Sequence, residues 1–69
     1  MISYAPFWKT IKKKKVSTYA LREKLGVGAN TLTRMRANKY LSLRTVEDFC
    51  RILDCRIQDI VEYVPDEKE

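Results

Sequence analysis

The amino-acid sequence predicts an all-α fold of five short helices in one small domain. The chain has 69 residues, of which 45% are hydrophobic and 33% charged, a balance typical of a folded domain. A chain of this length has room for a single domain, residues 1–69. Apolar residues recur at spacings of three and four, and turn-forming residues separate these segments.

The first predicted helix spans about residues 5–15 and has a proline in its first turn, where proline is well tolerated. Its apolar stripe, which we expect to face the core, consists of Phe7, Trp8 and Ile11. Consecutive lysines follow at the helix end, where they complement the helix dipole.

Two further helices, about residues 18–25 and 29–38, are predicted on either side of a short turn. Ser17 and Thr18 are candidate N-caps for the first of them, and Gly26 can adopt the left-handed conformation that ends it. Asn38 can end the other in the same way. The residues expected to hold these helices together are Leu21, Leu25, Val27, Leu32 and Met35.

The remaining segments predict two more helices and a small β-ribbon. Ser42 is expected to cap a fourth helix, which carries an apolar face of Leu43, Val46, Phe49, Cys50 and Leu53. Ile57, Ile60 and Val61 support a short fifth helix. Residues 1–4 and 61–64 alternate apolar and polar, so we expect the two chain ends to pair as a β-ribbon.

The charges divide the chain into two unlike parts. Residues 1–46 hold 11 basic side chains and one acidic side chain, that of Glu23. Residues 47–69 hold 3 basic and 8 acidic side chains. This distribution predicts one side that faces a polyanion and another that faces a different partner.

The composition excludes several classes of function. The chain has no histidine, and Cys50 and Cys55 are not spaced as CxxC, which excludes a disulfide framework and a Cys/His zinc site. Because it also lacks a known catalytic motif, we expect no catalytic residue, no metal and no cofactor. We further expect a cytoplasmic protein with no membrane contact and no small-molecule ligand, since no long apolar run, signal peptide or pocket can be recognised.

Residues 18–38 form the most informative segment, a helix–turn–helix pattern. The outward face of its second helix carries small, amide, hydroxyl and guanidinium groups and no acid: Ala29, Asn30, Thr33, Arg34 and Ala37. Arginine can pair with guanine and asparagine with adenine in the major groove, and alanine or threonine can contact a thymine methyl group. The face is therefore suited to reading base edges.

The stretch LREKLGVGANTLTRMRANK resembles the Cro-type, lambda-repressor-like helix–turn–helix of small bacterial and phage regulators, the xenobiotic-response-element family. SLRTVEDFCRILDCRIQDIVEY resembles the fourth and fifth helices of that family. The resemblance implies base contacts from Ala29, Asn30, Thr33 and Arg34. It implies phosphate contacts from Thr18, Tyr19, Gly28, Lys39 and Tyr40.

Two positions depart from the family pattern. Arg22 stands where a small alanine usually packs between the two helices, and its stem can instead lie along the surface or approach a phosphate. Gly28 stands where serine or threonine often caps the second helix, so we expect a looser helix start.

The resemblance implies a sequence-specific regulator of double-stranded DNA, most often a repressor that binds a palindromic operator as a homodimer. The acidic and apolar segment 57–64 is the expected dimer surface, with Ile57, Ile60, Val61 and Tyr63 at the interface. A protein-interaction or antitoxin-like module of the same fold is the alternative. Single-stranded RNA binding is disfavoured because the aromatic residues are not on a sheet face.

Overall fold

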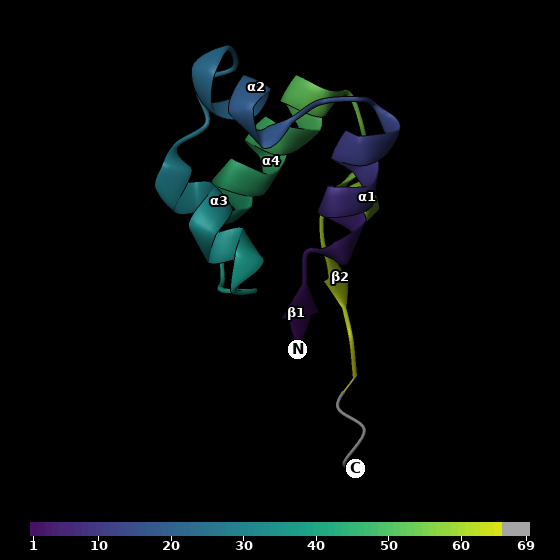
Figure 1. Ribbon diagram of the computed structural model, residues 1–69. Coiled ribbons are helices and arrows are strands. Elements are labelled where there is room, and N and C mark those ends of the chain that lie inside the picture. The colour runs from purple at the N-terminus through teal and green to yellow at the C-terminus, as the bar shows by residue number, and fades with distance from the viewer. Residues whose placement is uncertain (66–69) are drawn as a thin grey trace.

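The computed structural model describes residues 1–65 and is mainly helical (Figure 1). In chain order the elements are β1 (Ile2–Ser3), α1 (Ala5–Lys13), α2 (Thr18–Glu23), α3 (Ala29–Arg36), α4 (Leu43–Leu53), the 3₁₀ turn η1 (Ile57–Asp59) and β2 (Glu62–Tyr63). The predicted helical fold and the predicted ribbon of the two chain ends are both confirmed. Residues 66–69, which end both the acidic part of the sequence and the predicted domain, lie outside the described residues.

The expectation of five α-helices is wrong by one. The fifth predicted helix is the 3₁₀ turn η1, which is only 3 residues long. It lies between Asp54, whose left-handed backbone ends α4, and the start of β2 at Glu62. Between these two points the Asp59 N–H bonds the Arg56 carbonyl at 2.9 Å and the Ile60 N–H bonds the Ile57 carbonyl at 3.0 Å, the three-residue spacing of a 3₁₀ turn.

The helix starts follow the sequence, whereas the helix ends come slightly earlier than predicted. Ser17 Oγ accepts a hydrogen bond from the Ala20 N–H at 3.0 Å, and Ser42 Oγ accepts one from the Thr45 N–H at 3.1 Å. Both serines are therefore N-caps. The first three α-helices end at residues 13, 23 and 36, because the residues that follow form the turn that closes each helix.

Left-handed residues close the helices. Gly26, with φ 77°, follows α2 as expected. Three residues other than glycine do the same after α1, α3 and α4, namely Lys15, Asn38 and Asp54, with φ of 60°, 54° and 51°. After each of them, the next N–H bonds the carbonyl five residues back, at 2.8–3.1 Å. This is the bonding of a Schellman cap, which satisfies carbonyls that a helix end leaves free.

One cluster of buried side chains holds the elements together: Tyr4, Phe7, Ile11, Leu21, Leu32, Met35, Val46, Phe49, Leu53 and Ile60. Phe7 is fully buried and meets Phe49 edge to face, with ring centroids 5.0 Å apart. The cluster thus joins α1 to the helix–turn–helix and to α4. Trp8, Val27 and Cys50 are half-buried and pack against it.

Two predicted core residues are exposed. Leu25 retains 44% of its accessible surface and Leu43 retains 76%. Leu25 follows the end of α2, where the chain turns toward Gly26, so its side chain no longer lies on the inward face of that helix. Leu43 is the first residue of α4 and lies beside the exposed loop that precedes the helix, before the inward face meets the core.

The chain ends lie side by side in an antiparallel ribbon, with Ile2 opposite Tyr63 and Ser3 opposite Glu62 (Figure 1). A ribbon of two strands is not stable alone. Buried residues adjoin both strands, Tyr4 after β1 and Ile60 before β2, and they fasten the ribbon to the core. Within residues 1–65, no helix has the length and apolarity needed to cross a membrane.

Candidate nucleic-acid interface

The exposed face of α3 brings together the four residues expected to contact bases. Leu32 and Met35 are almost completely buried and fix which side of the helix faces the core. The opposite side is exposed and presents Ala29, Asn30, Thr33 and Arg34. No aspartate or glutamate occurs between residues 23 and 47, so α3 and the segments flanking it carry no negative side chain. A phosphate can approach this surface without meeting a carboxylate.

The N-terminal end of α3 is open. Gly28 occupies the N-cap position with φ −68° and ψ 146°, and it offers no side-chain hydrogen bond to the first turn. The exposed Gly28 thus leaves the backbone N–H groups of that turn without a side-chain cap. A Cβ atom at this position would meet nothing within 4 Å. Unpaired N–H groups at a helix N-terminus favour an anion.

The start of α2 lies against this same end of α3. A shallow hollow of about 200 Å³ is lined by residues of both helices: Thr18, Arg22, Ala29, Leu32, Thr33 and Arg36. Thr18 is half-buried at the first position of α2, and Tyr19 beside it keeps 62% of its surface exposed. The structure therefore places Thr18, one of the two expected phosphate contacts of α2, beside the first turn of α3.

Arg22 and Arg36 both line this hollow, so the departure at Arg22 adds positive charge beside α3. The guanidinium of Arg36 also lies over the Trp8 ring, 5.6 Å from the ring centroid. This cation–π contact ties α3 to α1. A helical wheel of α3 alone does not reveal this contact, because Trp8 belongs to another helix.

The C-terminal end of α3 is held by several hydrogen bonds. The Arg34 guanidinium donates from Nη2 to the backbone carbonyl of Tyr40 at 2.7 Å. Tyr4 donates its N–H to Asn38 Oδ1 at 3.2 Å and its hydroxyl to the Lys39 carbonyl at 2.7 Å. Burial raises the pKa of the Tyr4 phenol above its ordinary value of 10.0. The loop after α3 is therefore anchored to the core through Tyr4.

The side chains of Lys39 and Tyr40 in this loop are accessible to a ligand. Lys39 is exposed, and Tyr40 keeps 75% of its surface. A hollow of about 420 Å³ beside them is lined by Met1, Ile2, Arg34, Asn38, Lys39 and Tyr40, with no acidic residue. Arg44, exposed in the first turn of α4 directly after this loop, is a basic residue that sequence reasoning did not place. The predicted Ser42 cap was a sequence signal for this position, because it puts Arg44 in the first turn of the helix that follows the loop.

The expected dimer surface needs one correction. Ile60 has no exposed surface, because its side chain completes the core of its own chain, and it cannot contact a second subunit from that position. Ile57 and Tyr63 keep 52% and 71% of their surface, and Val61 is half-buried. These three residues remain a predicted interface. Apolar periodicity alone cannot distinguish a core residue from an interface residue, since both are hydrophobic.

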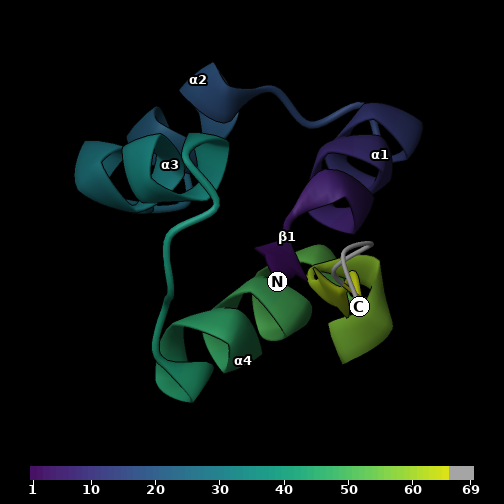
Figure 2. The same cartoon turned by 90° about the horizontal axis from the view of Figure 1, so that it is seen from below.

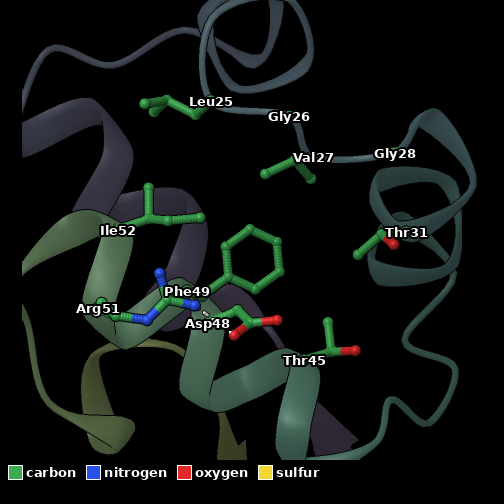
Figure 3. Close-up of a pocket in the computed structure, with 10 residues that line it drawn as sticks. All are labelled: Leu25, Gly26, Val27, Gly28, Thr31, Thr45, Asp48, Phe49, Arg51 and Ile52. Atoms are coloured by element: carbon green, nitrogen blue, oxygen red, sulfur yellow. Dashed lines mark hydrogen bonds and ion pairs between the residues drawn. The ribbon is translucent and has the colours of Figure 1, made fainter.

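A separate groove of about 350 Å³ lies between the helix–turn–helix and α4 (Figure 3). Leu25, Val27 and Thr31 line one side of it, and Phe49 and Ile52 of α4 line the other. Thr45, Asp48 and Arg51 also line this groove, so it is an opening of mixed polarity away from the outward face of α3. No group of three or more His, Cys, Asp or Glu that could hold a metal ion occurs within residues 1–65.

Three comparisons with known proteins agree with this geometry. Residues 7–66 match the family model of the Cro/C1-type HTH DNA-binding domain. The chain is 34% identical over 59 residues to YozG, an uncharacterised HTH-type transcriptional regulator of Bacillus subtilis (strain 168), covering 83% of this chain and 70% of that protein. A crystal structure of the transcriptional regulator VanUg (form II) superposes with a TM-score of 0.83 at 31% identity, covering 94% of this chain and 87% of the other.

Proposed function

Because the chain belongs to the Cro/C1-type family of helix–turn–helix DNA-binding domains, we propose that it is a homodimeric repressor that reads a palindromic operator through α3. One observation carries the proposal: the exposed face of α3 presents four residues suited to base edges, with no acid on α3 or on the segments flanking it. The regulator would act where the DNA is, the cytoplasmic location expected from the sequence.

The chemistry of the α3 face supports direct readout in the major groove. Arg34 can donate two hydrogen bonds to O6 and N7 of guanine, and Asn30 can pair with N6 and N7 of adenine. Ala29 and the methyl group of Thr33 suit the methyl group of thymine. The hydrogen bond from Arg34 to the Tyr40 carbonyl uses Nη2, so the other N–H groups of the guanidinium can pair with a base edge while this bond is kept.

Phosphate contacts would fix the orientation of α3 in the groove. Thr18 and the backbone N–H of Gly28 lie at the open end of the helix, and the exposed Tyr19 follows Thr18 in α2. Lys39 and Tyr40 follow the anchored end. Contacts on both sides of α3 would hold it against the two strands that border the groove. Such contacts set register and affinity without specifying sequence.

A homodimer would supply the second reading helix. A single α3 contacts a few base pairs, and proteins with this motif usually bind two half-sites roughly 34 Å apart. Ile57, Val61 and Tyr63 are apolar, at least partly accessible and set in the acidic third of the chain, which is unsuited to phosphate. A core this small also gains stability from burial against a second subunit.

Selection of binding sites from a random duplex library, with the purified full chain at physiological salt, tests the proposal. We expect a palindromic motif, and light scattering should give the mass of a dimer. Recovery of no motif, with binding that disappears at physiological salt, would show that α3 does not read sequence. If the chain selects a motif but binds it as a monomer, only the dimer part of the proposal is contradicted.

A second candidate function, a protein-interaction or antitoxin-like module, is favoured by the groove beside Leu25, which combines apolar side chains with the charged Asp48 and Arg51. That function predicts a stable complex with another protein and no sequence preference on DNA. The same selection distinguishes the two, because an interaction module would enrich no motif.

A further inference from the structure

Tyr4 connects the start of the chain to the end of α3. It is 2% exposed and directly precedes α1. Its two hydrogen bonds reach Asn38 and Lys39, which are 34 and 35 residues away in sequence. Both partners belong to the turn that closes α3, so the backbone N–H and the buried side chain of this one residue hold the turn from the core side.

The residues that Tyr4 holds are continuous with those proposed to contact DNA. Asn38 is left-handed, and the following N–H, that of Lys39, bonds the Arg34 carbonyl at 2.9 Å. The next carbonyl, that of Tyr40, accepts the Arg34 guanidinium. A shift of the Lys39 backbone would therefore move the exposed Lys39 side chain and also the anchor of Arg34.

We infer that Tyr4 is a positioning residue for DNA recognition, which fixes the Lys39–Tyr40 backbone so that the loop and Arg34 are already placed when DNA arrives. This inference rests on the proposed function. Binding groups are effective when supporting hydrogen bonds hold them in place, because ordering a loop at the moment of binding reduces affinity. Tyr4 itself is buried and contacts no DNA.

The variant Tyr4→Phe tests the inference, because phenylalanine keeps the buried ring and removes only the bond to the Lys39 carbonyl. On the selected operator we expect the dissociation constant of the full chain to rise roughly three- to tenfold. We also expect the slope of log K against log salt to decrease by about one, as for the loss of one phosphate contact. A residue that only stabilises the fold would leave this slope unchanged.

Thr10→Val is the matched control. It removes another side-chain hydroxyl that donates to a carbonyl, that of Asp59, at 2.8 Å, on the side of α1 away from α3. We expect it to lower the melting temperature in a similar way while the salt slope stays at the wild-type value. Thermal melts establish that each protein is folded at the temperature of the binding assay.

Asn38→Gly provides an independent route, because glycine adopts the positive φ of this position and the variant removes only the acceptor of the Tyr4 N–H. Its control is Asp54→Gly, at the equivalent left-handed end of α4. We expect Asn38→Gly to weaken binding and reduce the salt slope, and Asp54→Gly to leave that slope unchanged. If Tyr4→Phe is unfolded in the assay, this pair decides the question.

Wild-type affinity and slope in the folded variants would overturn the inference and leave the proposed function intact. Failure of the wild-type chain to select any operator would instead overturn the proposed function. A loss of affinity with an unchanged slope would also contradict the positioning role, since it indicates a smaller folded fraction rather than a displaced loop.

Discussion

The two ends of α3 are built in different ways, although both border the face proposed to read DNA. The N-terminal end begins at Gly28 without a side-chain cap. The C-terminal end is closed by the left-handed Asn38 and held by Tyr4 through two hydrogen bonds. Figure 2 shows the molecule from below, with β1 between α4 and α1 and the loop from α3 to α4 running along the outside.

This difference suggests a division of roles between the two ends. The open end offers backbone N–H groups to an anion and can adjust, because no side chain determines its geometry. The anchored end carries the longer side chains, those of Arg34 and Lys39. Because a long side chain has many rotamers, its charged group is placed less precisely by the backbone. Hydrogen bonds from the core are concentrated at the end where long side chains most need a fixed backbone.

The largest effect is expected at the anchored end, from Arg34→Ala. Loss of a bidentate contact to a base should cost about 1–3 kcal/mol of binding free energy on the operator. Competition assays with the operator and with a non-specific duplex measure this cost. Arg51→Ala is the matched control, because Arg51 is an exposed arginine of α4 paired with Asp48. Equal losses in both variants would mean that Arg34 contributes only charge.

Tyr4→Phe should lower the free energy of unfolding by about 1–2 kcal/mol, because the Lys39 carbonyl loses its partner in a partly buried site. Urea titration near neutral pH measures this change. A variant as stable as the wild-type chain would show that water replaces the hydroxyl at no cost. The hydrogen bond from Tyr4 would then contribute nothing to the stability of the anchored end.

The same residue predicts a pH dependence. Burial raises the pKa of Tyr4 in the folded chain above its ordinary value of 10.0, so the unfolded chain releases the phenolic proton first. The stability that Tyr4 contributes is therefore present below about pH 10 and is lost as the pH rises through the raised pKa. Wild-type stability should fall more than that of Tyr4→Phe between about pH 9 and pH 11. Parallel curves would contradict the raised pKa.

At the open end, Gly28→Ser should raise the free energy of unfolding by about 0.5–1 kcal/mol. The backbone of Gly28 suits any residue, the added Cβ meets nothing within 4 Å, and the serine hydroxyl can cap the first turn of α3. Gly26→Ser is the matched control and should destabilise the chain, because the φ of 77° at this position is strained for any residue other than glycine. Equal effects of the two substitutions in thermal melts would refute this view of the open end.

The smallest effect is expected from Lys39→Ala, which should weaken binding to all duplexes alike, by about 0.5 kcal/mol. The slope of log K against log salt should decrease by about one. Binding at several salt concentrations measures it. A loss confined to the operator would instead assign Lys39 to base readout.

The sequence predicted what depends on local pattern. The serine caps, the left-handed Gly26, the buried face of α3 and the ribbon of the chain ends follow from spacing and from conformational preferences. Most of these features involve short stretches of chain. The ribbon joins distant stretches, but the alternation of apolar and polar residues at both chain ends was sufficient to predict it.

What the sequence could not predict depends on distant contacts. The bonds of Tyr4 join residues 34 and 35 positions apart, and no pattern in either segment encodes their pairing. Arg36 meets Trp8 although the two residues belong to different helices, 28 positions apart in sequence. Ile60 had the periodicity of an interface residue and proved to be core, because hydrophobicity does not reveal which surface a side chain meets.

Site selection carried out in parallel with the wild-type chain and with Arg34→Ala is the decisive measurement for sequence readout by α3. We expect a palindrome for the wild-type chain, and for the variant the same palindrome with one degenerate base pair in each half-site. Identical motifs from the two proteins, or no motif from the wild-type chain, would contradict the claim that the exposed face of α3 reads DNA sequence.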